Sequence, residues 1–285
     1  MKAILPAVKK LAGFTLVELV IVISLTGVVA VMASTIVGQQ MLGYVDTARR
    51  AQLVAKADAA LSMMTRDLRN AIPYSIRISG NAIEWVPIQG FGRYRKFPDA
   101  GSGDVLDFSI ADSRFDTFGA MPTLISGNQL VIANSAAAAS GYNLYQSASD
   151  GTSLPLGSHV VTSPGVGISS SGPQVVLSTP FQFSQDSIAS RFYVINGAAS
   201  YICNSSTGTI TRYQSYPLQA SQPSNGSAPP LSTTSSSLLV GDVSGCVFGY
   251  TALNQTHGLV TVQIDLALEG ESISLVRFVH VENRP

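Results

Sequence analysis

The stretch Gly13-Phe14-Thr15-Leu16-Val17-Glu18 joins a short basic leader to a long apolar segment. Three lysines lie in the leader, and from Phe14 to Val37 the sole ionisable side chain is Glu18. A run of more than ~20 apolar residues is long enough to cross a bilayer as a helix. A secretory signal is cut after its apolar core. Here the expected cut, after Gly13, precedes the core, so we expect the helix to stay in the mature chain.

The glutamate in this apolar segment needs a physical explanation. An unpaired charge at bilayer depth costs roughly 2.5–3.5 kcal/mol on insertion scales. Glu18 therefore needs either a neutralising partner or a position near the membrane interface. One interpretation pairs it with the positive amino terminus of a neighbouring subunit, freed by cleavage after Gly13. The other interpretation places Glu18 among the lipid headgroups, in a protein that is only anchored by a single membrane span.

The order of basic leader, glycine, phenylalanine and apolar helix with an early glutamate resembles the type IV prepilins and the pseudopilins of type II secretion. The resemblance implies that a membrane-embedded prepilin peptidase cuts after Gly13 and methylates the new amino terminus at Phe14. It implies that Glu18 sets subunit register during assembly. The implied partners are other minor pilins, a major pilin, the inner-membrane assembly platform and membrane lipid.

Two details refine this resemblance. Many major pilins carry a proline that kinks the helix, whereas the segment around Thr35 has none. The subunit at the very tip of related systems lacks the glutamate, because no subunit lies ahead of it. The presence of Glu18 therefore argues against the outermost position.

Composition narrows the class of protein. The chain has 285 residues, 12% of them charged, and a formal net charge of zero. Loss of the leader at residues 1–13 removes three lysines and no acidic residue, which leaves a mature charge of −3. No basic patch indicates binding to nucleic acid. The abundance of serine, threonine and glutamine fits an exported surface better than a cytosolic enzyme.

The helix is expected to continue beyond the apolar span. After Val37 the pattern becomes amphipathic, with apolar residues at three- and four-residue steps on one face. These residues are Leu53, Ala57, Ala60, Leu61, Met64 and Leu68. Pro73 then ends the helix. We predict one helix from about Phe14 to about Ala71, with residues 14–40 in the membrane or fibre core and 41–72 offering a stripe to a β-sheet. The alternative is two helices that break near Gly38 or Gly43.

Residues 73–285 are expected to form a β-rich head. The candidate strands are short and bounded by turn residues. They are Tyr74–Ile78, Ala82–Ile88, Val105–Ile110, Gln129–Ala133, Gln174–Leu177, Arg191–Asn196, Ser200–Cys203 and Thr209–Tyr213. The clearest signal is the alternation over 260–268, followed by a turn at Gly270-Glu271 and a strand over 272–281. The predicted fold is α+β and type IV pilin-like, a long N-terminal helix packed on an antiparallel sheet.

The two cysteines, Cys203 and Cys246, are predicted to form a disulfide, because the head of such an anchored chain lies in an oxidising compartment. Two buried free thiols are the alternative. A metal site is disfavoured, since there is no paired CxxC and no histidine at ligand spacing. The Ser- and Pro-rich stretch 220–237 is expected to be an exposed loop inside the disulfide ring.

Enzymatic motifs are missing from the sequence, so we predict no catalytic residue and no cofactor. His159, His257 and His280 are far apart in the chain. His257, in a turn-like run, and His280, in the terminal strand, are interpreted as surface or hydrogen-bonded strand histidines. Two further groups of residues each allow two interpretations. Asp104, Asp107, Asp112 and Asp116 suggest either a calcium site or, with more weight, a solvated acidic edge. Trp85, Tyr94, Phe91 and Phe97 suggest either a sugar platform or, with more weight, core aromatics.

Several shorter fragments resemble smaller groups within the prepilins and pseudopilins. Arg66–Ala71 resembles the helix end in the group of prepilins that includes the minor pilins called PilW and the pseudopilin GspJ. Fragments of the C-terminal third are similar to minor pilin-like proteins of the mannose-sensitive haemagglutinin (MSHA) pilus: 201–203, 210–213, 243–248, 270–272 and 279–283. This resemblance implies a low-copy subunit, inserted in the inner membrane with its head in the periplasm, that helps prime assembly at or near the fibre tip. A type II secretion pseudopilin and a tip adhesin are the alternatives.

Overall fold

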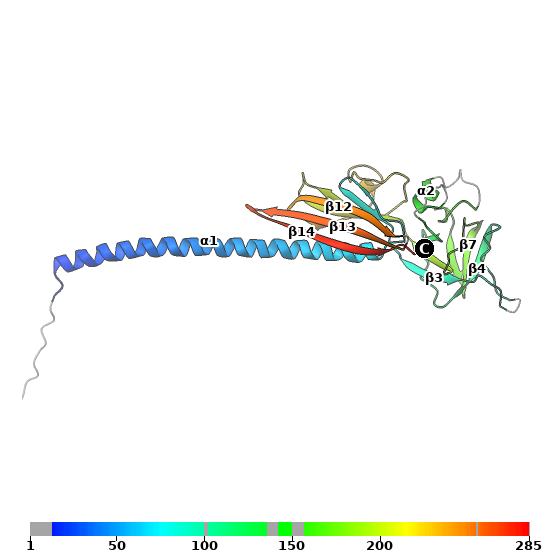
Figure 1. Ribbon diagram of the computed structural model, residues 1–285, viewed down its shortest axis with the longest axis horizontal. Coiled ribbons are helices and arrows are strands. Elements are labelled where there is room, and N and C mark those ends of the chain that lie inside the picture. Colours follow the sequence, from blue (N-terminus) through cyan, green and yellow to red (C-terminus); the bar gives the residue numbers. More distant parts are fainter. Residues whose placement is uncertain (1–12, 100–101, 136–141, 150–156, 255, 285) are drawn as a thin grey trace, which may run out of the picture. The chain divides into compact units, whose positions relative to one another are not determined.

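The computed structural model describes residues 13–99, 102–135, 142–149, 157–254 and 256–284. The chain divides into two compact units, Met1–Ala51 and Gln52–Pro285. The boundary between them falls within the first helix, α1 (Leu16–Arg69) (Figure 1). Apart from Gly13, the predicted leader lies outside the described residues.

Helix α1 is continuous, as predicted. It passes Gly38 and Gly43 without a break, so the two-helix alternative is wrong. Its ends lie two residues inside the predicted ones, which is within the usual uncertainty of helix boundaries. The predicted apolar stripe is also confirmed, because Leu53, Ala57, Ala60, Leu61, Met64 and Leu68 are all at most 3% exposed.

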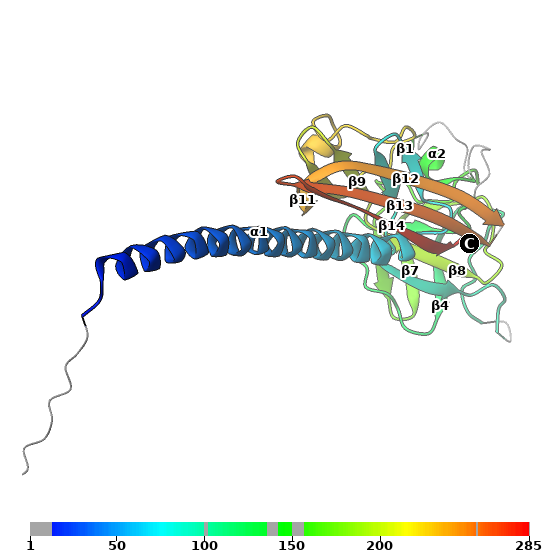
Figure 2. The same ribbon diagram turned by 60° about the vertical axis from the view of Figure 1, so that its left-hand side comes forward.

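Two antiparallel sheets bury this stripe in one hydrophobic core. The five-stranded sheet has the order β1 (Arg77–Ser79), β2 (Ala82–Trp85), β9 (Ala198–Asn204), β10 (Thr209–Tyr216) and β11 (Ser235–Val240). The three-stranded sheet contains β12 (Val243–Asn254), β13 (His257–Leu268) and β14 (Glu271–Glu282). Figure 2 shows β9 and β12–β14 over the C-terminal part of α1.

The C-terminal hairpin is confirmed, with a small correction to its turn. Val260 pairs with Val279, and the side chains of β13 alternate between a buried face and a half-exposed one. The turn is Glu269-Gly270, both with positive φ (48° and 90°), and Glu271 already belongs to β14. Positive φ at both central residues is what a two-residue hairpin turn of the favoured twist requires.

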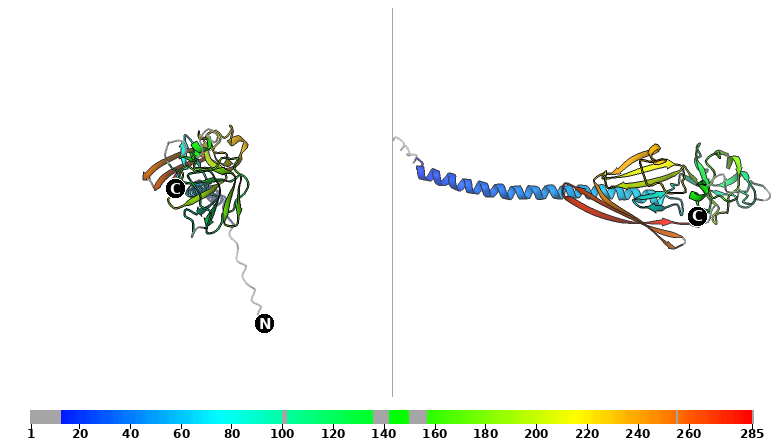
Figure 3. Two further views of the ribbon diagram at one scale, coloured as in Figure 1. Left: turned by 90° about the vertical axis from the view of Figure 1, so that its right-hand side faces the viewer. Right: turned by 90° about the horizontal axis from the view of Figure 1, so that it is seen from above.

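A six-stranded sheet forms a third group of strands with a core of its own (Figure 3). Its order is β5 (Gln129–Val131), β8 (Arg191–Ile195), β3 (Gly90–Tyr94), β4 (Asp112–Phe118), β7 (Gln174–Phe181) and β6 (Ile168–Ser171). The short helix α2 (Leu144–Ser149) and the 3₁₀ turn η1 (Leu231–Thr233) complete the described elements.

Several predicted strands need correction. Residues 105–110 form no strand, because the Asp107 carboxylate accepts bonds from the backbone N–H and the hydroxyl of Ser109 and turns the chain locally. The first strand begins at Arg77, since Tyr74 has a φ of 60° that no strand accommodates. The end of the predicted 220–237 loop belongs to β11. Strands β3, β4, β6, β11 and β12 were not predicted.

Candidate functional site

The start of α1 is fixed by a side-chain cap. Thr15 precedes the first helical residue, and its Oγ1 accepts a hydrogen bond of 3.2 Å from the backbone N–H of Glu18. This is the bond of an N-cap threonine to the third helical residue, and Thr-x-x-Glu is the sequence signature of a capping box. That signature is present in the sequence and is a signal from which the cap could have been predicted.

Glu18 itself is exposed, and no side chain of the described residues pairs with its carboxylate. An acidic residue in the first turn interacts favourably with the positive end of the helix dipole. That interaction lowers the cost of the charge without neutralising it. The carboxylate is therefore open to a positive group from another chain.

The segment that follows has the length and polarity of a membrane span. Leu16–Val37 has a mean hydropathy of 2.5, and none of it is buried inside the described part of the chain. Three of its four hydroxyl groups bond back to helix carbonyls: Ser24 to Val20 O (2.8 Å), Thr26 to Val22 O (2.7 Å) and Thr35 to Met32 O (2.9 Å). Polar groups satisfied within the helix are compatible with an apolar surrounding.

In the head, a disulfide joins Cys203 to Cys246 across a sequence separation of 43, and no described cysteine is free. Cys203 lies on β9 of the five-stranded sheet and Cys246 on β12 of the three-stranded sheet. The bond therefore connects the two sheets that cover the stripe of α1.

The three histidines occupy unrelated positions. His159 is 3% exposed beside the ring of Phe181, with 5.8 Å between the ring centroids. His257 Nδ1 lies 2.7 Å from the hydroxyl of Thr256, and His280 is exposed on β14. Within the described ranges, no cluster of three or more His, Cys, Asp or Glu side chains is arranged to hold a metal ion.

Three of the four aspartates of the predicted acidic edge have polar partners in the six-stranded sheet, whereas the Asp107 carboxylate bonds to Ser109 of its own loop. Asp116 lies 3.4 Å from Arg95 Nε and accepts a bond of 2.8 Å from Gln174. The Gln174 bond is the main reason why the pKa of Asp116 is lowered. Asp104 pairs with Arg114 at 3.3 Å, while its partial burial raises its pKa.

The four predicted aromatics do not form one platform. Trp85 stacks on Tyr201 with ring centroids 4.8 Å apart, in the core that also contains the α1 stripe. Tyr94 is buried in the separate core of the six-stranded sheet. Phe91 and Phe97 are 66% and 73% exposed, so the core interpretation is right for two of the four residues and wrong for the other two.

Comparison with known proteins gives one match. Residues 9–34 match the family profile described as the prokaryotic N-terminal methylation motif. No curated protein and no solved structure gives a significant match to the chain. The motif implies processing by a prepilin peptidase and handling by pilus assembly machinery, and it supports a membrane-anchored protein that is similar to type IV pilins and pseudopilins.

Proposed function

We propose that the chain is a minor pilin of a type IV pilus of the MSHA type, which helps prime fibre assembly at or near the tip. The observation that carries the proposal is the joint between leader and span. The expected cut precedes an apolar span, Leu16–Val37, whose single acidic side chain, Glu18, has no partner among the described residues.

In this proposal the peptidase cuts between Gly13 and Phe14 and methylates Phe14. Both residues are exposed, ahead of the capped start of α1. Cleavage creates an ammonium group on each subunit. A neighbouring subunit's ammonium would neutralise Glu18 and so favour one register between adjacent helices.

In this proposal each segment of the chain has a separate role. Residues 14–40 would lie in the inner membrane and later in the fibre core, and 41–72 would carry the head at 73–285. The head would first lie in the periplasm, an oxidising compartment that suits the bond between Cys203 and Cys246. The membrane lipid, the assembly platform, the major pilin and other minor pilins are the proposed partners.

The choice of the MSHA type rests on the C-terminal third. Fragments at 201–203, 210–213 and 243–248 resemble those of MshO, a minor pilin-like protein of that pilus. The second candidate is a type II secretion pseudopilin similar to GspJ, which the helix end at Arg66–Ala71 favours. A tip adhesin fits less well, because Glu18 argues against the outermost position.

A deletion strain tests the proposal. We expect fewer surface fibres without the gene, recovery on complementation, and the protein in small amounts among fibres sheared from complemented cells. A control assay of type II secretion is expected to be unaffected. Loss of secretion with normal fibres would instead identify a pseudopilin, and normal fibres with normal secretion would contradict both assignments.

A further inference from the structure

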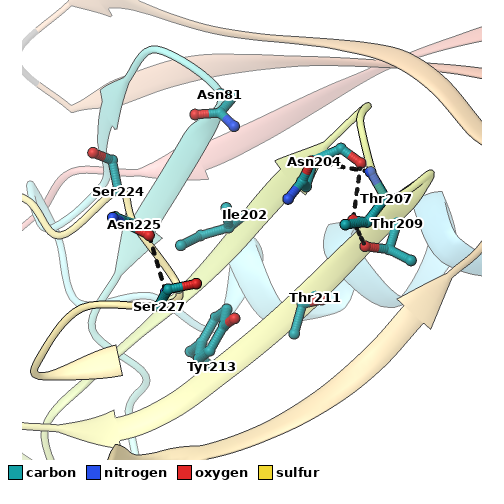
Figure 4. A pocket seen from close by; sticks show the side chains of 11 residues that line it. Asn81, Ile202, Asn204, Thr207, Thr209, Thr211, Tyr213, Ser224, Asn225 and Ser227 are labelled. Atoms are coloured by element: carbon teal, nitrogen blue, oxygen red, sulfur yellow. Dashed lines mark hydrogen bonds between the residues drawn. The ribbon is translucent and has the colours of Figure 1, made fainter. Parts of the chain in front are cut away.

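One corner of the five-stranded sheet carries an open pocket. Because adjacent residues of a strand point to opposite faces, Tyr201, Cys203 and Ile210 pack on the stripe of α1 while their neighbours face away from it. On that far face Leu218 and Leu231 cover part of the sheet. The uncovered remainder is a pocket of about 390 Å³ between the ends of β9 and β10 and the loop at 224–227 (Figure 4).

The pocket is lined almost entirely by uncharged polar groups. Eleven residues form it, and nine of them are Asn, Ser, Thr, Tyr or Gly residues from the end of β9, the β9–β10 turn, β10 and the 224–227 loop. Ile202 and Asn81 complete the lining, and none of the eleven is an Asp, Glu, His, Lys or Arg residue. Such a lining offers nothing to neutralise a phosphate, a carboxylate or a metal ion. Its many hydroxyl and amide groups would lose water without compensation against an apolar ligand.

The walls are held in place by bonds among their own residues. Asn204 Oδ1 accepts the backbone N–H groups of Ser206 (3.0 Å) and Thr207 (3.2 Å), and Asn225 Oδ1 accepts that of Ser227 (3.0 Å). The hydroxyls of Thr211 and Ser224 make no hydrogen bond within the described part of the chain. The pocket is thus preformed and keeps hydrogen-bonding capacity for a ligand.

An aromatic ring completes the lining. Tyr213 lies at the wall formed by β10, close to the loop, and a Cβ at position 226 would overlap its hydroxyl. Gly226 therefore allows the loop to approach the ring closely. An aromatic ring beside several hydroxyl and amide groups presents both an apolar face and groups that donate and accept hydrogen bonds.

We propose that this pocket binds a neutral saccharide. Sugar hydroxyls both donate and accept hydrogen bonds, and sugar C–H faces pack on aromatic rings, so each part of the lining has a counterpart. The volume lies within the usual range of small-ligand sites, ~300–1,000 Å³. The pocket lies on the sheet face opposite to α1, so it stays open when the helix packs in a fibre. Only the statement that the pocket stays open in a fibre rests on the proposed function.

Saturation-transfer NMR on the full chain tests the assignment. The protein is placed in nanodiscs rather than in a glycoside detergent, and the probes are methyl glycosides of neutral hexoses and N-acetylhexosamines, with glucuronate as the anionic comparison. We expect saturation transfer to at least one neutral glycoside and none to glucuronate. This result does not require fibre assembly, so it is independent of the proposed pilus role.

Substitutions at Thr211 locate the site. Thr211→Val keeps the side-chain shape and removes one hydroxyl, so we expect roughly fivefold weaker binding, as for one lost hydrogen bond. Thr211→Trp fills the pocket and is expected to abolish binding. Thr251→Val, on an exposed position of β12, is the matched control and is expected to bind as the wild type does. An intact disulfide and an unchanged melting temperature show that each variant is folded.

Results from two experiments would overturn the proposal. In the NMR experiment, either the absence of saturation transfer to every neutral glycoside or equal transfer in the folded Thr211→Trp variant would do so. The second experiment places a photo-crosslinking amino acid at position 211 in living cells. A crosslinked polypeptide would show that the pocket is a protein contact, whereas a glycan adduct would support the assignment and reveal whether the sugar is the cell's own or is supplied from outside.

Discussion

The phenolic hydroxyl of Tyr201 donates a hydrogen bond of 2.6 Å to the Asp67 carboxylate at the end of α1. Arg212 Nε donates to the same oxygen at 2.8 Å. These three residues come from three separate fragments, 66–71, 201–203 and 210–213, each of which resembles pilin-like proteins. Burial, and then the Asp67 carboxylate, raises the pKa of Tyr201, so this hydroxyl remains a donor. The fragments thus meet in one polar contact between helix and sheet.

Removal of the Asp67 carboxylate should lower the stability of the head. Asp67→Ala leaves the Tyr201 hydroxyl and the Arg212 guanidinium without their shared acceptor in a part-buried setting. We expect a loss of about 1–3 kcal/mol in the free energy of unfolding, the usual cost of partly buried groups left unsatisfied. Urea unfolding of the full chain, followed by tryptophan fluorescence, is the measurement, because Trp85 stacks on Tyr201.

The matched control lies on the same helix. Asp58 pairs with Arg277 at 2.6 Å, but the two side chains are 57% and 34% exposed. Such a pair contributes about 0–1 kcal/mol. Asp58→Ala should therefore cost clearly less than Asp67→Ala, and equal losses would show that the contact with Tyr201 and Arg212 adds nothing specific.

The disulfide is expected to be a large single contribution to stability. In the chain-entropy model, a ring closed across 43 residues contributes about 4 kcal/mol. The double variant Cys203→Ala, Cys246→Ala should lose about this amount, and reduction of the wild type should give a similar loss. Without denaturant or reductant, a thiol reagent should modify neither cysteine; labelling of both would exclude the bond.

Stability should also depend on pH through Glu84. This side chain is fully buried on β2, where Arg77 pairs with it and Tyr216 donates a bond of 2.8 Å. Burial raises the pKa of Glu84 more than these partners lower it. The folded state therefore holds the proton more tightly than the unfolded state, so this contribution to stability falls as pH rises from the ordinary glutamate pKa through the folded one.

Glu84→Gln does not titrate and should escape this loss. We expect the stability of the variant relative to the wild type to rise with pH across that window and then to level off. Unfolding free energies measured from about pH 4 to about pH 8 provide the comparison, with Glu282→Gln on the exposed end of β14 as the control. A relative stability that falls with pH would contradict the raised pKa. The absolute difference at one pH is not diagnostic, since Arg77 also loses its anionic partner.

The sequence predicts those parts of the fold that local patterns determine. The stripe of α1 and the alternation of β13 repeat every three to four and every two residues, and each pattern identifies its buried face directly. The same holds for the N-terminal motif, in which leader, glycine and apolar span follow one another. For Glu18, the position of a charge in an apolar segment indicates the need for a partner. The spacing of Thr15 and Glu18 also indicates a capping box, which is not among the predictions above.

The six-stranded sheet could not be predicted in the same way. Its strands pair across long separations, as in β3 with β8, where Phe91 lies opposite Tyr193. No local pattern carries that information. The burial of Tyr94 and the exposure of Phe91 depend on this pairing, since the two residues lie on opposite faces of β3. The corner pocket beside Thr211 is likewise visible only once the loop at 224–227 is placed.

Processing at the leader can be tested directly on the mature protein. N-terminal sequencing and mass spectrometry should find N-methylphenylalanine from Phe14, because the cut is expected after Gly13, where the chain is exposed. Gly13→Leu should leave the leader attached by blocking the cut, while the span still inserts. A mature wild-type protein that still begins at Met1 would exclude the processing step.

Two roles of the motif at the start of α1, charge pairing through Glu18 and helix capping through Thr15, can be separated because the two side chains carry different groups. Thr15→Ala removes the acceptor of the 3.2 Å bond, at a cost of about 1 kcal/mol to the helix start, and keeps the carboxylate. Glu18→Ala removes the carboxylate and keeps the backbone N–H that Thr15 caps. Glu18→Gln keeps the shape and removes only the charge.

If the charge pairs with a neighbouring ammonium, both Glu18 variants should be strongly depleted from sheared fibres but normal in the membrane fraction, while Thr15→Ala should be recovered nearly as well as the wild type. Immunoblots of the two fractions give the measurement. If capping is the only role of the motif, Thr15→Ala should instead be the most impaired variant and Glu18→Gln close to normal. Because the charge and the cap are removed separately, the ranking of the three variants identifies which interaction the fibre requires.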